Sequence, residues 1–134
     1  MHQDYKPKGY SSVAVYVMAD GAQRVIDFLK ATFDAEVLRR SDRPDGSIMH
    51  AEVRIDDTVV MLADGGGQFP AFPVWLHVYV PDVDATYRRA LAAGGVSVQE
   101  PSQQGDPDRR GGVQDPVGNT WWIATQVGAA GLQE

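Results

Sequence analysis

The sequence predicts an α+β protein in which two repeated β-α-β-β-β modules form a curved mixed sheet, with the helices on its outer face and a cleft inside. Three observations predict this fold. Runs rich in β-branched and aromatic residues alternate with two segments of helical periodicity. The order of these segments occurs twice, and the copies keep a nearly constant offset, 63 residues at the first strand and 62 at the last. Such a repeat indicates two similar modules, and a ligand site is expected on the concave surface between them.

The first module is assigned to residues 10–64. A β-branched run at residues 13–17 predicts its first strand. Asp20, with Gln23 three positions later, predicts a helix start of the capping-box type. The apolar residues that follow at helical spacing are Val25, Ile26, Leu29 and Phe33. Three further strands are predicted at residues 36–40, 48–55 and 58–63, with turns at 43–46 and 56–57.

The second module is assigned to residues 75–127, after a linker at 65–74 that is rich in glycine and proline. Its first strand is predicted at 76–80. Asp82 or Asp84 caps its helix, and Gly94 ends it. The inward positions of this helix are Val83, Tyr87, Ala90 and Leu91. The remaining strands are predicted at 96–99, 109–114 and 120–125, with a turn at 115–119. Residues 1–134 are therefore treated as one domain of two modules.

The composition is that of a globular domain, with 134 residues of which 43% are hydrophobic and 22% charged. The net charge is −6, and no run of Lys and Arg has the density of a phosphate-binding face, which argues against a nucleic-acid partner. The absence of cysteine excludes disulfides, thiolate metal sites and a cysteine nucleophile. No segment approaches the roughly 20 apolar residues that span a bilayer. We therefore expect a cytoplasmic protein without a membrane partner.

The side-chain period of two along each strand separates a helix-packing face from a cleft face. On the two first strands, the helix-packing residues are Val13, Val15 and Val17, repeated as Leu76, Val78 and Val80. The cleft residues are Ser12, Ala14 and Tyr16, repeated as Trp75, His77 and Tyr79. In the strand at 48–55, the cleft face carries Ile48, His50, Glu52 and Arg54, and the opposite face carries Met49, Ala51, Val53 and Ile55. In the last strand, Trp121 is assigned to the core and Trp122 to the cleft.

The last hairpin carries the most specific motif, Asp115-Pro-Val-Gly-Asn-Thr-Trp-Trp-Ile-Ala-Thr125. Together with the duplicated module, this motif resembles the vicinal oxygen chelate superfamily, which includes glyoxalases, extradiol dioxygenases and bleomycin-resistance proteins. Residues 108–116 and 80–85 most resemble its PhnB-like branch. The resemblance covers residues 10–127, and because one fold hosts many reactions it names no single activity. Since relatives commonly form dimers, the resemblance also implies a homodimer.

The resemblance implies a divalent metal held by His and Glu or Gln at inward positions of the first and last strands of each module. Carried over to this sequence, those positions are Ser12, Val60, Trp75 and Trp122. None of the four is a usual ligand of zinc or iron, which need converging N, O or S donors. We therefore predict no metal cofactor. The alternative is a relocated divalent metal on His50, Glu52 and His77, in an isomerase, lyase or dioxygenase of the superfamily.

The leading hypothesis is a protein that binds a small, partly aromatic molecule in the cleft without the usual metal site. Aromatic rings with a few polar atoms suit a planar ligand. The predicted stacking or wall residues are Tyr16, Trp75, Tyr79 and Trp122. The predicted polar contacts are His50, Glu52, His77 and Arg109. Arg109 matches an arginine of the PhnB-like branch, and it either neutralises an anionic ligand or holds a loop carbonyl. No catalytic residue is assigned, and a dimeric scaffold without a ligand is a third hypothesis.

Overall fold

The computed structural model describes residues 4–128. The first module consists of β1 (Tyr16–Ala19), α1 (Ala22–Phe33), β2 (Glu36–Asp42), β3 (Ile48–Ile55) and β4 (Thr58–Asp64). The second module consists of β5 (Trp75–Tyr79), α2 (Val83–Ala92), β6 (Val96–Gln103), β7 (Asp108–Gln114) and β8 (Thr120–Gln126). This order confirms the predicted α+β fold with its repeated β-α-β-β-β module.

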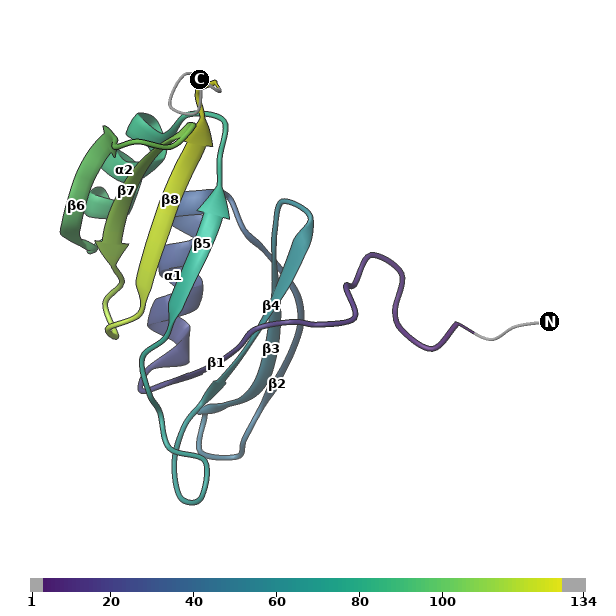
Figure 1. The fold of residues 1–134 in the computed structure, drawn as a ribbon. Coiled ribbons are helices and arrows are strands. Elements are labelled where there is room, and N and C mark those ends of the chain that lie inside the picture. Colours follow the sequence, from purple (N-terminus) through teal and green to yellow (C-terminus); the bar gives the residue numbers. More distant parts are fainter. Residues whose placement is uncertain (1–3, 129–134) are drawn as a thin grey trace.

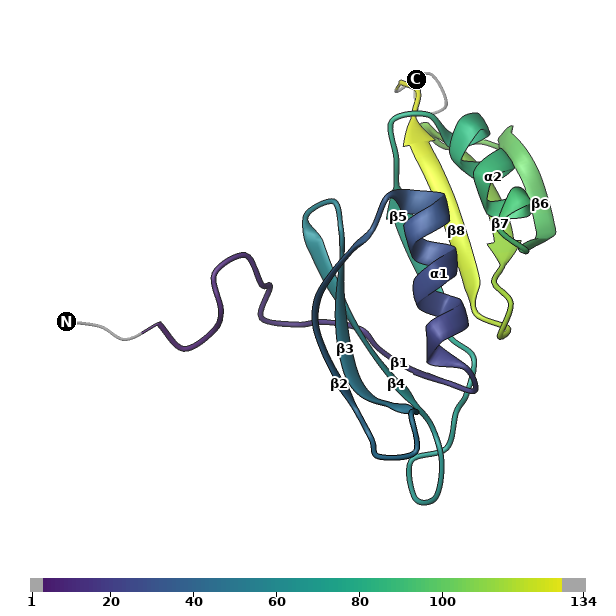
Figure 2. The same cartoon turned by 180° about the vertical axis from the view of Figure 1, so that it is seen from behind.

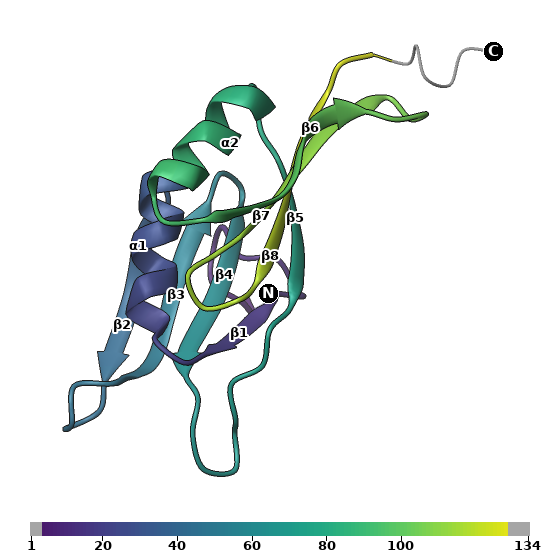
Figure 3. The ribbon, with the colours of Figure 1, turned by 90° about the vertical axis from the view of Figure 1, so that its left-hand side faces the viewer.

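Each module forms its own four-stranded mixed sheet, with the strand orders β1-β4-β3-β2 and β5-β8-β7-β6 (Figure 1). The first strand of each module runs parallel to the last, and the other pairs are antiparallel. Each helix covers its own sheet, and the two helices pack against each other, as Figure 2 shows from behind and Figure 3 from the side. Within residues 4–128, no helix combines the length and the apolar character that crossing a bilayer requires.

The first helix does not begin with the predicted capping box. Its N-cap is Gly21, at φ 105°, and no side chain of the helix start caps it. The carboxylate of Asp64, at the end of β4, instead accepts hydrogen bonds from the amides of Gly21 and Ala22 at 3.2 and 2.8 Å, and from Ile48 N at 2.7 Å. Because the left-handed conformation at Gly21 turns the first amides toward β4, the cap comes from another strand, a partner that local sequence cannot show.

The second helix begins as predicted, because Asp82 accepts from the amide of Ala85 at 3.1 Å. Its buried stripe runs through Val83, Tyr87 and Ala90. Leu91, predicted to point inward, is 37% exposed since it lies at the margin of that stripe.

Two strands differ from the sequence prediction in ways that concern the faces of the sheet. The first strand begins at Tyr16 rather than Val13, because only residues 16–19 pair with β4, and Val13 is 85% exposed. In β3, Ile48 is buried in the core and Met49 is half exposed, the reverse of the prediction. A register shift at Ser41 and Asp42 of β2 breaks the alternation there, as a bulge does, and from Ala51 onward the predicted alternation holds.

The last hairpin confirms the predicted roles of its motif. Trp121 is fully buried and packs its ring against Phe33 of the first module, with centroids 5.6 Å apart. The buried carboxylate of Asp115 accepts from the amides of Val117 and Asn119 and from the side chains of Asn119 and Trp121, at 2.9–3.0 Å. Asp115 and Asn119 are therefore turn formers that anchor the core tryptophan.

The offset between the modules is 61 positions at the helices and at the first and last strands, not 62 or 63. Between β3 and β7 it is 60 positions (112 minus 52), because Glu52 pairs with Met61 and Gly112 with Trp122. The helices begin at Ala22 and Val83, 61 positions apart (83 minus 22). The pairs Tyr16↔Met61 and His77↔Trp122 extend the same offset to the outer strands. The two similar pentapeptides at residues 13–17 and 76–80 are 63 positions apart, so they are shifted by two residues relative to this structural alignment. A slip of two preserves which face each residue occupies, so the assignments of those first strands survive it.

Candidate functional site

Each sheet has a polar and aromatic face on the side away from its helix. The first face consists of Tyr16, Arg39, His50, Glu52 and Met61. The second face consists of Trp75, His77, Tyr79, Arg110 and Trp122. The register places Tyr16, Met61, Glu52 and Arg39 in one row across β1, β4, β3 and β2. The rows on either side of this one are buried in the core, with Val17 paired to Leu62 on one side and Val53 paired to Val60 on the other, which fixes the orientation of the first face.

The first face is organised around the carboxylate of Glu52, which is 3% exposed. Its Oε1 accepts from the Tyr10 hydroxyl at 2.5 Å and from Arg39 Nε at 3.0 Å. Its Oε2 lies 2.8 Å from His50 Nε2. Burial by itself raises the pKa of Glu52, but the hydrogen bonds from Tyr10, His50 and Arg39 together outweigh it and hold the pKa below its ordinary value. Glu52 is therefore an ionised, multiply bonded anchor.

The tautomer of His50 follows from this anchor. An ionised carboxylate only accepts, so the neutral imidazole carries its proton on Nε2 and donates it to Glu52. Its Nδ1 is then an acceptor, and the Tyr16 hydroxyl, 2.7 Å away, donates to it. The first face thus holds a directed chain of hydrogen bonds from the half-exposed Tyr16 to the buried Glu52.

The second face is dominated by two indole rings. Trp75 and Trp122 meet edge to face with centroids 5.3 Å apart, and Trp75 is 75% exposed. Gly112 makes this arrangement possible, because a Cβ at that position would lie 2.6 Å from the Trp122 ring. The indole nitrogen of Trp122 is buried and has no hydrogen-bond partner within the described part of the chain.

The polar part of the second face is centred on Arg110. Its Nη2 donates to Asp108 at 2.9 Å, its Nη1 to Asp106 at 3.2 Å and its Nε to His77 Nε2 at 3.1 Å. The Tyr79 hydroxyl also donates to Asp108, at 2.7 Å. Burial, followed by the charge of Arg110, lowers the pKa of His77. Since a guanidinium only donates, His77 is a neutral acceptor toward it.

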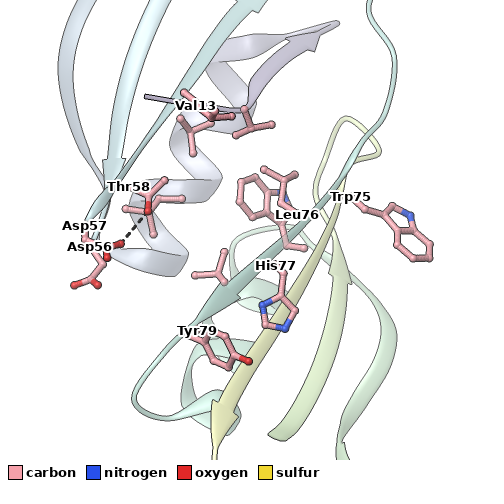
Figure 4. A pocket seen from close by; sticks show the side chains of 14 residues that line it. Val13, Asp56, Asp57, Thr58, Trp75, Leu76, His77 and Tyr79 are labelled. Carbon is pink, nitrogen blue, oxygen red and sulfur yellow. Dashed lines mark hydrogen bonds between the residues drawn. The ribbon is translucent and has the colours of Figure 1, made fainter. Parts of the chain in front are cut away.

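Two cavities adjoin this face. One, of about 400 Å³, lies over the second face and is bounded by Trp75, Trp122, Arg110 and the polar side chains of β6. The other, of about 470 Å³, lies between the modules. Figure 4 shows its walls, with Val13 and residues 56–58 of the first module across from β5, and with Trp75 pointing away. Its floor is apolar and includes Trp121.

The structure brings the predicted site residues together as two groups rather than one. Tyr16, His50 and Glu52 are bonded to one another on the first face. Trp75, His77, Tyr79 and Trp122 are grouped on the second face, as their contacts with each other and with Asp108 and Arg110 show.

The assignment of Arg109 to the cleft is wrong. Its Nε and Nη2 form a bidentate ion pair with the carboxylate of Asp84 of α2, each at 2.9 Å, on the helix side of the sheet. Arg110 occupies the cleft face instead, since it lies two positions from Gly112, the register partner of Trp122. Sequence reasoning also missed Tyr10 and Arg39, which reach Glu52 from outside β3.

The expected metal positions also change. Val60 is a core residue, 3% exposed, and the offset of 61 positions makes Met61 the equivalent of Trp122 and Ala14 the equivalent of Trp75. These positions supply no nitrogen or oxygen ligand from a side chain, so they do not fit the expected cation. Nor does the described part of the chain bring three or more His, Asp or Glu side chains together in a metal-binding group, so His50, Glu52 and His77 do not converge.

Comparison with known proteins agrees with this architecture. An uncharacterized protein of Mycobacterium bovis, Mb0911c, is 36% identical over 134 residues, covering 92% of this chain and 88% of that protein. The structure of TioX from Micromonospora sp. ML1 superposes with a TM-score of 0.70 and 26% identity, covering 86% of this chain and 95% of TioX. TnmS3 from Streptomyces sp. CB03234, described as an antibiotic binding protein, gives a TM-score of 0.67 at 20% identity, covering 93% and 99%.

The family model described as Glyoxalase/Bleomycin resistance protein/Dioxygenase superfamily matches residues 12–123, most of both modules. The match includes both faces described above. The chain therefore belongs to the glyoxalase, bleomycin resistance protein and dioxygenase superfamily.

Proposed function

We propose that this protein binds a small, partly aromatic molecule on its second face. The observation that carries the proposal is the pair of Trp75 and Trp122 beside the network of Arg110 and His77, at the mouth of a cavity of about 400 Å³. A cavity of that size accepts a small organic ligand, and indole rings offer it flat apolar surface.

The exposure of the aromatic side chains supports this proposal. Trp75 is 75% and Tyr79 62% exposed, on the same face of the same strand. Apolar surface gathered in this way is characteristic of binding sites.

The charges of the second face favour a neutral or cationic ligand. All three kinds of donor nitrogen of Arg110 are engaged, two with the carboxylates of Asp106 and Asp108 and one with His77. Two carboxylates against one guanidinium leave a net negative charge beside the cavity. Arg110 is thus a support for His77 and Asp108 rather than a receptor for an anion.

The comparisons support the same proposal at the level of a shared fold. TnmS3 is described as an antibiotic binding protein, so this fold hosts the binding of a small molecule. A PhnB protein from Bacillus cereus gives a TM-score of 0.65 at 18% identity, covering 86% of this chain and 99% of that one. We assign the chain to the PhnB-like branch as part of the proposal, on its segments at 80–85 and 108–116.

Tryptophan fluorescence tests this function. A panel of planar antibiotics and aromatic metabolites, neutral, cationic and anionic, is titrated into the wild-type protein and into Trp75→Ala. Trp75→Ala is the informative variant because its exposed side chain can be removed without opening the core. We expect at least one neutral or cationic compound to bind with a Kd that rises at least tenfold in Trp75→Ala. Binding of no compound, together with near-stoichiometric metal in protein purified without chelators, would overturn the proposal and favour a metal-dependent enzyme.

A homodimer is the second part of the proposal. In the described sheets, β1, β2, β5 and β6 are outer strands with one hydrogen-bonded neighbour each. Such edges are protected in folded proteins, and a second copy can cover them. Light scattering after size-exclusion chromatography is expected to give twice the chain mass of 14.6 kDa. A monomer at all concentrations from micromolar upward would contradict it.

A further inference from the structure

The first face carries chemistry that ligand binding does not need. We propose that Glu52, His50 and Tyr16 form a metal-free proton relay, with Tyr16 as the catalytic residue. The relay would remove an acidic C–H proton from a small planar carbonyl or heteroaromatic compound. This activity goes beyond the proposed binding function, and it belongs to the opposite module.

The relay has the geometry of a base oriented by a carboxylate. Glu52 Oε2 lies 2.8 Å from His50 Nε2, and His50 Nδ1 lies 2.7 Å from the Tyr16 hydroxyl. Both distances are within the range for proton transfer between bonded partners. A hydroxyl, an imidazole and a buried carboxylate in this order are the arrangement by which enzymes activate a weak nucleophile or base.

The two ends of the relay differ in exposure, as the proposed step requires. Glu52 is 3% exposed and holds two further donors, Tyr10 and Arg39, so its charge and position are fixed. Tyr16 is 42% exposed. Its oxygen donates to His50 and keeps its lone pairs for a proton from outside. Met61, the register partner of both Tyr16 and Glu52, places a thioether between them on the same face.

The proposed step moves two protons and needs no other reactant. The ligand's C–H bond breaks, and its proton bonds to the phenol oxygen of Tyr16. At the same time the original phenol proton moves to His50 Nδ1. The electron pair stays on the ligand as an enolate or expels a bonded leaving atom. The imidazolium that forms lies against the ionised Glu52, which stabilises its positive charge.

The second module indicates that this relay is not a requirement of the fold. By the strand register, His77 stands at the position of Tyr16 and Arg110 at the position of His50, and the two also contact each other. There the guanidinium only donates, so it cannot take a proton from His77. The same two positions therefore carry a hydroxyl bonded to a proton acceptor in the first module, and an imidazole bonded to a cation in the second.

The elimination of 5-nitrobenzisoxazole tests the relay. Removal of the C3 proton of this planar compound breaks its N–O bond and releases coloured 2-cyano-4-nitrophenolate, so the assay reports base catalysis directly. We expect Tyr16→Phe to lower kcat/KM by roughly 10²-fold, the lower end of what a positioned base contributes. Tyr87→Phe is the matched control, since it removes a phenol hydroxyl of helix α2 that is hydrogen-bonded to Ser97, and it is expected to keep the wild-type rate.

Chemical rescue separates catalysis from structure. His50→Ala is expected to lose a similar factor and to regain at least a tenth of the wild-type rate in added imidazole, whereas Tyr16→Phe regains none above the buffer background. Circular dichroism of each variant checks that it is folded. Wild-type rates in a folded Tyr16→Phe, or equal effects of imidazole on both variants, would overturn the relay. Fluorescence quenching by the probe without turnover would defeat the relay and leave the binding proposal intact. Turnover that is unchanged in Trp75→Ala would support the relay, because it would show that the reaction of this probe does not depend on the second face.

Discussion

The first and second faces can be compared position by position, because the repeat of the module makes their positions equivalent. The equivalent pairs are Tyr16 and His77, His50 and Arg110, Glu52 and Gly112, and Met61 and Trp122. In the first module, the side chain of Glu52 occupies the middle of the sheet and holds three donors. In the second, position 112 has no side chain, and the ring of Trp122 fills the space.

This difference shows how one scaffold acquires two kinds of surface. The rows that face the helices are apolar in both modules, because both must bury one side of a sheet. The opposite rows carry no such constraint. One carboxylate organises an acid–base chain on the first face, and the loss of one side chain opens the second face to an indole. The faces can therefore diverge without changing the fold.

The largest difference that mutation can expose lies in the closing hairpins. The second module closes with Asp115, whose buried carboxylate holds four donors, while the first closes with the exposed turn of Asp56 and Asp57. We expect Asp115→Ala to lower the free energy of unfolding by about 4 kcal/mol, because several buried donors lose their partner. Urea unfolding measures this. Asp57→Ala is the control, with an expected change below about 0.5 kcal/mol, and equal losses in both variants would break the comparison.

The next prediction tests whether the Trp122 ring of the second face depends on the absence of a side chain at Gly112. In Gly112→Ala the new Cβ would lie 2.6 Å from Trp122, so the ring must move, at about 2 kcal/mol. The Trp fluorescence spectrum should shift, and ligand binding should weaken with it. Gly66→Ala adds a Cβ that meets no atom within 4 Å and should leave both properties unchanged. An unshifted spectrum in Gly112→Ala would show that the Trp122 ring does not depend on this glycine.

These faces also show what the sequence could and could not predict. Trp121 and Trp122 were assigned correctly, because a strong turn and a period of two fix their sides. Arg109 and Arg110 precede Gly111 and Gly112, so no apolar alternation says which arginine faces the cleft. Val60 stands in an unbroken apolar run at residues 59–63, where no alternation of apolar and polar residues assigns Val60 to one face of the sheet. The sequence therefore predicted the fold and most of the residues on each face.

The contacts that Tyr10 and Arg39 make with Glu52 could not be predicted from local sequence patterns. Tyr10 lies before the first strand, and Arg39 lies on another strand that reaches Glu52 through a bulged register. Partners of this kind are set by tertiary packing. The separation of the predicted site residues into two groups likewise depends on how the two sheets are placed, which the periodicity of the sequence does not describe.

The third prediction uses pH to test the buried carboxylate of Glu52, which the second face lacks. The folded-state pKa of Glu52 lies below its ordinary value, so its ionised form stabilises the fold. That stabilisation is fully present above the ordinary pKa of a glutamate and is lost as the pH falls through the folded-state value. We expect Glu52→Gln to cost about 2 kcal/mol at neutral pH and progressively less in acid. Urea midpoints at pH 7 and at pH values below that ordinary pKa measure this, and a cost that does not change with pH would contradict it.

The smallest effect concerns the helices. Thr32 of α1 is fully buried, and its hydroxyl has no hydrogen-bond partner within the described residues. Its equivalent 61 positions later, Ala93, has no hydroxyl to satisfy. Thr32→Val keeps the shape and removes the unpaired group, so we expect unfolding free energy to rise by up to about 1 kcal/mol. Thr32→Ser keeps the hydroxyl and loses a methyl, so it should destabilise by about 1 kcal/mol. If Thr32→Val is the less stable of the two, the hydroxyl has a partner, and the first helix is as well satisfied as the second.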